Sequence, residues 1–232
     1  MSDGAPDGAV GAVELSDIVL ELGALQTREE FAASVIREAI IRGRFRPGQR
    51  LAQDLIAASL GISRMPVRAS LRRLETEGLI EFHPYRGASV RLMSPAEIGE
   101  LYDLRLLLER HLIAEVGRRH APAELAVLDE EADRIRVLRG GRGWLEDRNA
   151  FYDALYEFAE QPRISVLVAG LRREVGPYLS LRPGVTGGHV HLGVFDHLRS
   201  GDVDAAISEA TRHLEVVKES LQGIAAALAA EA

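Results

Sequence analysis

The segment from Ser63 to Gly78 constrains the fold more than any other stretch of the sequence. Its large apolar residues recur every three or four positions, which is the spacing of one buried helix face: Val67, Leu71 and Leu74. Its arginines lie four apart on a different face: Arg64, Arg68 and Arg72. The segment therefore predicts a helix, capped by Ser63, that packs on one side and presents guanidinium groups on another. A surface helix exposed to solvent could carry the same charges, so the function of this helix has to be inferred from the neighbouring elements.

Two shorter helices are predicted before this segment. The first covers residues 27–43 and begins with a capping box formed by Thr27 and Glu30. The second covers residues 51–61 and ends at a glycine, and three of its apolar residues are expected to face the core: Leu51, Leu55 and Ile56. The intervening stretch contains Pro-Gly and is predicted to be a turn.

Two strands are predicted after Gly78, at residues 79–82 and 88–93, around the turn HPYRG. Three helices followed by a two-stranded ribbon describe a winged helix-turn-helix at residues 27–93. Such a domain inserts its third helix into the major groove of DNA, N-terminal residues first, and its wing into the adjacent minor groove. We therefore expect DNA contacts from Arg50, Ser63, Arg64, Arg68, Arg72, Arg86 and Gly87.

The distribution of charge supports this interpretation, although the net charge of the chain is -7. Residues 27–93 contain twelve arginines and seven acids, whereas residues 1–26 contain five acids and no base. We expect residues 1–26 to be a flexible acidic tail. Cysteine is absent, and neither a signal peptide nor an apolar run of membrane-spanning length is evident, so a cytoplasmic protein without a membrane partner is expected.

Residues 94–228 have a helical pattern throughout. A capping box of Ser94 and Glu97 opens the first helix. Six helices are predicted, at residues 95–119, 122–138, 144–160, 162–179, 189–200 and 202–230. Because the joints between them are short, the sequence predicts an antiparallel all-α bundle. The expected fold class is therefore mainly α, with a winged helix-turn-helix before a helical bundle.

Two resemblances to known families extend these predictions. The stretch PGQRLAQDLIAASLGISRMPVRASLRRLETEGLIEFHPYRGASV resembles the DNA-binding domain of GntR family transcription regulators, and this implies base or phosphate contacts that include Met65. Met65 and Ala69 depart from the family pattern, so base preference is expected to differ there. The stretches LYDLRLLLE and HLGVFDHLRSGDVDAAISEATRHL resemble the effector-binding and dimerisation FCD domain of the FadR subfamily.

Many FCD domains bind a divalent metal through an Asp and three His residues. His191 and His213 match two of these ligands, but Tyr152 stands at the third His position and Arg148 at the Asp position. One expectation is a degenerate site for Zn, Ni or Mn at His191 and His213. The alternative is a metal-free pocket that holds a carboxylate directly, with five residues around it: Arg105, Arg148, Tyr152, His191 and His213. A third possibility is that both histidines are ordinary buried residues.

The resemblance implies a homodimeric, ligand-responsive transcription regulator that binds a double-stranded, pseudo-palindromic operator. We expect a repressor that a small carboxylate-bearing metabolite releases from DNA. The alternative is a metal- or ligand-binding enzyme built on the helical domain, with a vestigial DNA-binding head. Because no nucleophile elbow, Walker loop, dinucleotide fingerprint or HExxH motif is present, we expect a protein that is not an enzyme.

Overall fold

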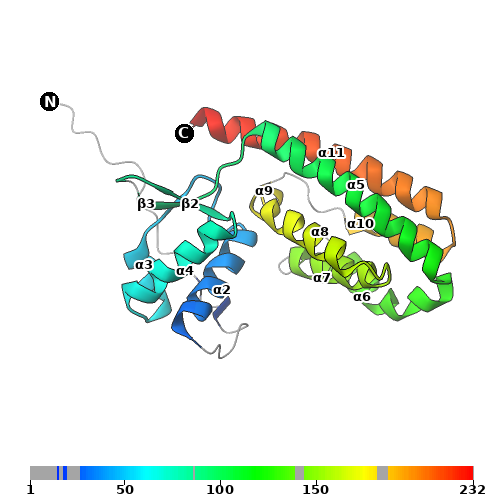
Figure 1. The fold of residues 1–232 in the computed structure, drawn as a ribbon, viewed down its shortest axis with the longest axis horizontal. Coiled ribbons are helices and arrows are strands. Elements are labelled where there is room, and N and C mark those ends of the chain that lie inside the picture. The colour runs from blue at the N-terminus through cyan, green and yellow to red at the C-terminus, as the bar shows by residue number, and fades with distance from the viewer. Residues whose placement is uncertain are drawn as a thin grey trace. The chain divides into compact units, whose positions relative to one another are not determined.

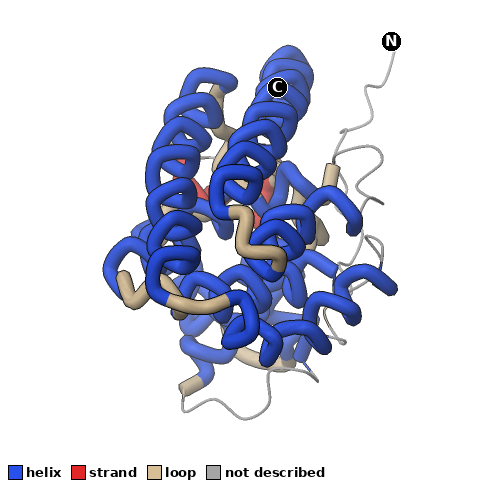
Figure 2. Tube along the Cα trace, turned by 90° about the vertical axis from the view of Figure 1, so that its right-hand side faces the viewer, coloured by secondary structure: helices blue, strands red, loops and turns tan. Residues whose placement is uncertain are grey.

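The computed structural model describes residues 27–85, 87–138, 144–181 and 188–231, together with Leu15, Ile18 and Val19. The chain forms two compact units, which divide between Arg91 and Leu92 (Figure 1). In the described ranges the only strands belong to the first unit, and the second unit is built from helices (Figure 2). The mainly α fold class predicted from the sequence is confirmed.

The first unit is a winged helix-turn-helix, as predicted. Its elements are α2 (Arg28–Ile41), β1 (Arg50–Leu51), α3 (Gln53–Leu60), α4 (Arg64–Thr76), β2 (Ile80–His83) and β3 (Gly87–Val90). Thr27 caps α2 by accepting a hydrogen bond from the Glu30 backbone N–H, as its sequence position indicated. Gly61 has a φ of 63°, a left-handed conformation that ends α3 and permits the sharp turn into α4.

Three details of the first unit differ from the sequence prediction. The ribbon has three antiparallel strands in the order β1-β3-β2, because Leu51 pairs with Ala88 instead of starting a helix. Helix α3 therefore begins at Gln53, and its Leu55 is 45% exposed instead of facing the core. Ser63 occupies the N-cap position of α4, but its side chain makes no capping hydrogen bond.

The core of the first unit forms around the apolar face of α4. Val67, Leu71 and Leu74 are all fully buried, as their spacing predicted. Burying a side chain of this size contributes roughly 1.5–3 kcal/mol, so this face anchors the helix firmly. Leu15 and Ile18, from the N-terminal segment, are also buried in this core, and the rest of residues 1–26 lies outside the described residues apart from Val19.

The second unit is an antiparallel helical bundle, as predicted. Its elements are α5 (Pro95–Arg119), the 3-10 helix η1 (Pro122–Leu128), α6 (Asp129–Leu138), α7 (Trp144–Glu157), α8 (Pro162–Glu174), α9 (Gly176–Leu179), α10 (Gly188–Arg199) and α11 (Val203–Glu231). The two longest helices, α5 and α11, lie side by side along the bundle (Figures 1 and 2). No helix within the described ranges has the length and hydropathy needed to cross a bilayer.

Two of the predicted helices of the bundle are interrupted. The predicted helix 122–138 begins as η1, and the Arg199 side chain holds this end by donating to the Pro122 carbonyl oxygen and to the Asp129 carboxylate. The predicted helix 162–179 breaks between α8 and α9, because the ring of Pro177 removes a backbone donor from a continuous helix. The capping box of Ser94 and Glu97 at the start of α5 is confirmed.

Candidate DNA-binding and ligand-binding sites

The exposed face of α4 carries the side chains expected to contact DNA. Arg64, Arg68 and Arg72 are exposed along it, opposite the buried apolar stripe. Met65 lies at the N-terminal end of the helix and is 73% exposed. The N-terminal turn of α4 contains no acid, and Ser63 just before it is exposed. The helix therefore presents guanidinium groups and a hydroxyl to solvent at the end expected to enter a groove.

Nearby side chains hold two of these arginines in place. The Arg64 guanidinium pairs with the carboxylate of Asp54 in α3, and both groups are largely exposed. The Arg72 guanidinium lies 3.9 Å from the centre of the Phe82 ring in β2, and it donates to Glu75 at 2.9 Å. Arg72 is thus stacked against the wing, whereas Arg68 projects from the middle of the exposed face.

A second ion-pair group fixes α2 against the end of α4. The Arg37 guanidinium in α2 donates two hydrogen bonds, of 2.7 and 2.8 Å, to the two carboxylate oxygens of Glu77. Arg73 in α4 donates to the same carboxylate at 3.3 Å. Hydrogen bonding from Arg37, followed by its charge and the contacts of Arg73, lowers the pKa of Glu77. This is a bidentate pair of the kind that orients helices.

The remaining residues expected at DNA lie in the small sheet. Arg50 is exposed in β1, where it pairs with Ser89 of β3. Gly87 opens β3 with a φ of 81°, a conformation that favours glycine at the tip of the wing. Arg86 lies outside the described residues. The wing tip that the sequence predicted is therefore formed by the hairpin between β2 and β3.

A buried group of charged and phenolic side chains lies inside the helical bundle. Arg105 and Glu109 are one turn apart on α5, and both are almost completely buried. The Arg105 Nε donates to Glu109 Oε1 at 2.8 Å, and the Tyr156 hydroxyl donates to Glu109 Oε2 at 2.8 Å. Burial by itself would raise the pKa of Glu109, but the charges of Arg105 and Arg172 outweigh it and lower that pKa. Glu109 is consequently a buried carboxylate that stays charged at neutral pH.

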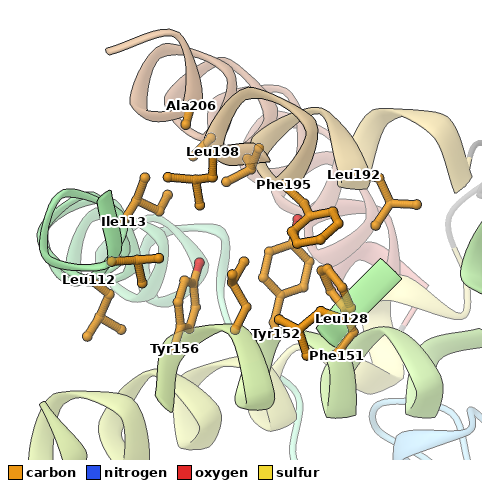
Figure 3. Close-up of a cluster of buried hydrophobic side chains, with 14 of the residues drawn as sticks. Leu112, Ile113, Leu128, Phe151, Tyr152, Tyr156, Leu192, Phe195, Leu198 and Ala206 are labelled. Atoms are coloured by element: carbon orange, nitrogen blue, oxygen red, sulfur yellow. The ribbon is translucent and has the colours of Figure 1, made fainter. Parts of the chain in front are cut away.

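Two more buried arginines flank Tyr152, which projects into the bundle from α7 next to Phe151 (Figure 3). The guanidinium carbon of Arg148 lies 5.4 Å from the centre of the Tyr152 ring, and that of Arg172 lies 5.6 Å from it. Burial raises the pKa of Tyr152 to about 12, so its hydroxyl remains protonated at neutral pH. Burial also lowers the pKa of Arg148, and the charges of Arg105 and Arg172 lower it further.

The structure brings together three of the five residues expected to bind a ligand: Arg105, Arg148 and Tyr152. His213 is half-buried in α11, and the side chain of His191 in α10 lies outside the described residues. Sequence reasoning missed Arg172 as a member of this group. Its signal was its position four residues after Val168 on α8, since Val168 is fully buried and the two share a helix face.

The comparisons with known proteins agree with both units. Residues 28–90 match the family model described as bacterial regulatory proteins, gntR family, and residues 100–216 match the FCD domain model. The second match alone spans half of the chain, and the first coincides with the winged helix-turn-helix. The chain belongs to the GntR family. This GntR-family protein is a transcription regulator with a DNA-binding domain and an effector-binding FCD domain.

Individual relatives of this regulator support the same assignment. It is 29% identical over 205 residues to an HTH-type transcriptional regulator in the unstable DNA locus of Streptomyces ambofaciens, covering 82% of this chain and 84% of the relative. It is 31% identical over 105 residues to the gluconate operon transcriptional repressor of Bacillus licheniformis, covering 45% and 43%. The solved structure of a GntR transcriptional regulator from Rhodococcus sp. RHA1 has a TM-score of 0.69 and 27% identity, covering 84% and 98%.

Two residues at positions that match the family's metal ligands suit a divalent cation poorly. Arg148 occupies the position of the acidic ligand, and its buried cation would repel a second cation. Tyr152 occupies a histidine position, and a phenol with a pKa of about 12 is a poor ligand at neutral pH. Among the described side chains, no three His, Cys, Asp or Glu residues are grouped as metal ligands. A buried guanidinium and a protonated phenol are groups that suit an anion better than a cation.

Proposed function

We propose that this regulator is a homodimeric repressor of the FadR subfamily, acting in the cytoplasm, that binds the two half-sites of a pseudo-palindromic operator. A small carboxylate-bearing metabolite would bind in the FCD domain and release the protein from DNA. The relative from Bacillus licheniformis is named a repressor, and this supports the proposal that the protein represses transcription. In this proposal the protein does not convert its ligand chemically, since the ligand serves only as a signal.

The exposed arginine face of α4 is the observation that carries the DNA-binding part of this proposal. A helix that buries Val67, Leu71 and Leu74 can present the opposite face to a groove without losing its anchorage. We assign base contacts to the N-terminal end of α4: Ser63, Arg64, Met65 and Arg68. We assign phosphate and minor-groove contacts to the flanking positions: Arg50, Arg72, Arg86 and Gly87. Because arginine binds a guanine edge with two hydrogen bonds, Arg64 and Arg68 are the proposed specificity residues.

Substitution of the two specificity residues tests this assignment. A selected operator duplex and a random duplex of equal length are compared in gel-shift titrations at one fixed salt concentration. Arg64→Ala and Arg68→Ala are each expected to weaken operator binding by about 1–3 kcal/mol and to reduce the preference over random DNA. Arg163→Ala, which removes an exposed arginine from α8, is the matched control and is expected to bind normally. Unchanged operator affinity in both α4 variants would refute the proposal.

Buried positive charge in the bundle supports the ligand-binding part of the proposal. Arg105 and Arg148 lie where a carboxylate would gain charge-assisted hydrogen bonds away from water, and Tyr152 adds a phenolic donor. His191 and His213 complete the proposed site from α10 and α11. A ligand at this position would have to bind the DNA-competent and released forms with different affinities to act as an inducer. Chromatographic analysis of incubated ligand, which should be recovered unchanged, separates this function from an enzymatic one.

A further inference from the structure

Met65 lies at the centre of the exposed face of α4. It precedes the buried Val67 by two positions, and Ala69 precedes the buried Leu71 in the same way. Because two positions turn a helix by about 200°, both side chains point almost directly away from the core of the first unit. Met65 is 73% exposed. The outermost line of the N-terminal half of this helix is therefore apolar.

The arginines of α4 do not cover this apolar line. Arg64 starts from one flank of the exposed face, and its guanidinium pairs with the carboxylate of Asp54 in α3. The Arg72 guanidinium lies 3.9 Å from the centre of the Phe82 ring in β2. These two cationic groups are thus directed toward α3 and toward β2. Met65 consequently remains accessible to a partner that lies in front of the helix.

The side chain of Met65 restricts which groups of DNA it can contact favourably. A thioether has no hydrogen to donate, and it accepts hydrogen bonds only weakly. Most atoms that the bases expose in the major groove are N–H donors or N and O acceptors, and these lose hydrogen bonds to water when an apolar side chain covers them. The 5-methyl group of thymine is the apolar group of these base edges. A flexible, polarisable methionine side chain packs well against such a group.

We propose that Met65 recognises the 5-methyl group of a thymine in the operator, and so selects the base at its position by apolar contact. This inference rests on the proposed function, which assigns a base contact to Met65 without naming the group that it contacts. Ala69, one turn further along α4, is small enough to let the helix approach the floor of the groove. The contact distinguishes thymine from the other three bases, while the neighbouring arginines supply charge and hydrogen bonds.

Deoxyuridine is a probe that removes only the methyl group of thymine. The preferred duplex of the full-length protein is first selected from a random-sequence library, and each thymine of one half-site is then replaced in turn by deoxyuridine. We expect one replacement to weaken binding by about fourfold, which is the effect of one buried methyl group. Exchanging the same T·A pair for C·G should also weaken binding, and 5-methylcytosine at that place should recover about fourfold of the loss. Gel-shift titrations at one salt concentration measure these ratios.

Variants of Met65 connect the methyl effect to this side chain. Met65→Gln has a similar length and helix propensity but ends in an amide, and it is expected to bind the thymine and deoxyuridine duplexes equally. Met65→Leu keeps an apolar side chain and is expected to retain at least about a twofold preference for thymine. Val137→Ser removes another exposed apolar side chain, from α6 of the second unit, and should keep the wild-type ratio. Because residue 65 is exposed, both of its variants should melt within a few degrees of the wild-type protein.

Two results would overturn this inference. One is equal binding of thymine and deoxyuridine duplexes at every position, and the other is a deoxyuridine effect that persists in Met65→Gln, since the methyl group would then contact another residue. A protein that still selects a defined sequence from the library would retain the proposed function in both cases. A library that yields no preferred sequence would refute the DNA-binding part of the proposed function together with this inference. A methyl effect that disappears in Met65→Gln and remains in Met65→Leu would support it.

Discussion

Arg105 Nε and Glu109 Oε1 form a 2.8 Å ion pair inside the bundle, one helical turn apart on α5. Burial by itself would lower the pKa of Arg105, but the charge and hydrogen bond of Glu109, together with the nearby Tyr102 and Tyr156, raise it, while the charge of Arg105 helps to lower the pKa of Glu109. The two side chains therefore stabilise each other in their charged forms. Glu109 is the single buried carboxylate among the described residues, so its removal is expected to affect stability.

Glu109→Gln is expected to destabilise the second unit by about 3 kcal/mol, because it leaves a buried guanidinium without its partner. Urea unfolding followed by Trp144 fluorescence measures the loss of stability. Glu100→Gln, an exposed change on the same helix, is the control. A loss of stability in Glu109→Gln no larger than that in Glu100→Gln would contradict a stabilising role for the ion pair.

Asp54 affects DNA binding through Arg64. The Asp54 carboxylate pairs with the Arg64 guanidinium on the surface expected to face DNA, where a carboxylate also repels phosphates. Asp54→Asn is therefore expected to increase DNA affinity by roughly 1 kcal/mol or less, the usual range for an exposed ion pair. Fluorescence anisotropy with a random duplex at two salt concentrations measures the change.

Asp103→Asn, which breaks an exposed ion pair with Lys218 in the second unit, is the control for this experiment. It is expected to leave DNA affinity unchanged. Weaker DNA binding by Asp54→Asn would indicate that the ion pair positions Arg64, instead of competing with DNA for it.

Helical periodicity predicted the fold well because most of the buried apolar residues follow the spacing of a helix. Val67, Leu71 and Leu74 are buried where their spacing placed them. Leu51 is buried as expected, but it lies in β1 and not in a helix, because pairing of β1 with β3 is a long-range interaction that local patterns do not contain. Buried charged residues are the second kind of feature that the sequence pattern did not predict. Spacing places Arg172 on the same helix face as Val168, but a charged residue is normally assigned to solvent, and only the surrounding bundle shows that this side chain is buried.

The Arg37–Glu77 pair predicts a specific pH dependence. Because the folded pKa of Glu77 lies below its unfolded value of about 4.3, its contribution to stability is present above that value and is lost as the pH falls through the folded pKa. Glu77→Gln is therefore expected to cost at most about 1 kcal/mol at pH 7 and progressively less below pH ~4, since the pair is partly exposed.

Hydrogen exchange of the α2 and α4 amides between pH 7 and pH 3 reports the stability of the first unit. A double-mutant cycle with Arg37→Ala isolates the pair from other effects of each substitution. A difference between wild type and Glu77→Gln that did not change with pH would show that packing, not the ion pair, causes the loss.

Gly117 permits the close packing of α5 against the start of α11. A Cβ at this position would overlap the side chain of Val203. Gly117→Ala is therefore expected to destabilise the second unit by about 1–3 kcal/mol through overpacking.

Gly223→Ala in α11 is the matched control, because no atom lies within 4 Å of its Cβ position. That change should stabilise the helix by up to about 1 kcal/mol through its higher helix propensity. Urea unfolding followed by Trp144 fluorescence checks both values, and Val203→Ala is expected to rescue Gly117→Ala. Failure of that rescue would locate the strain outside the contact between α5 and α11.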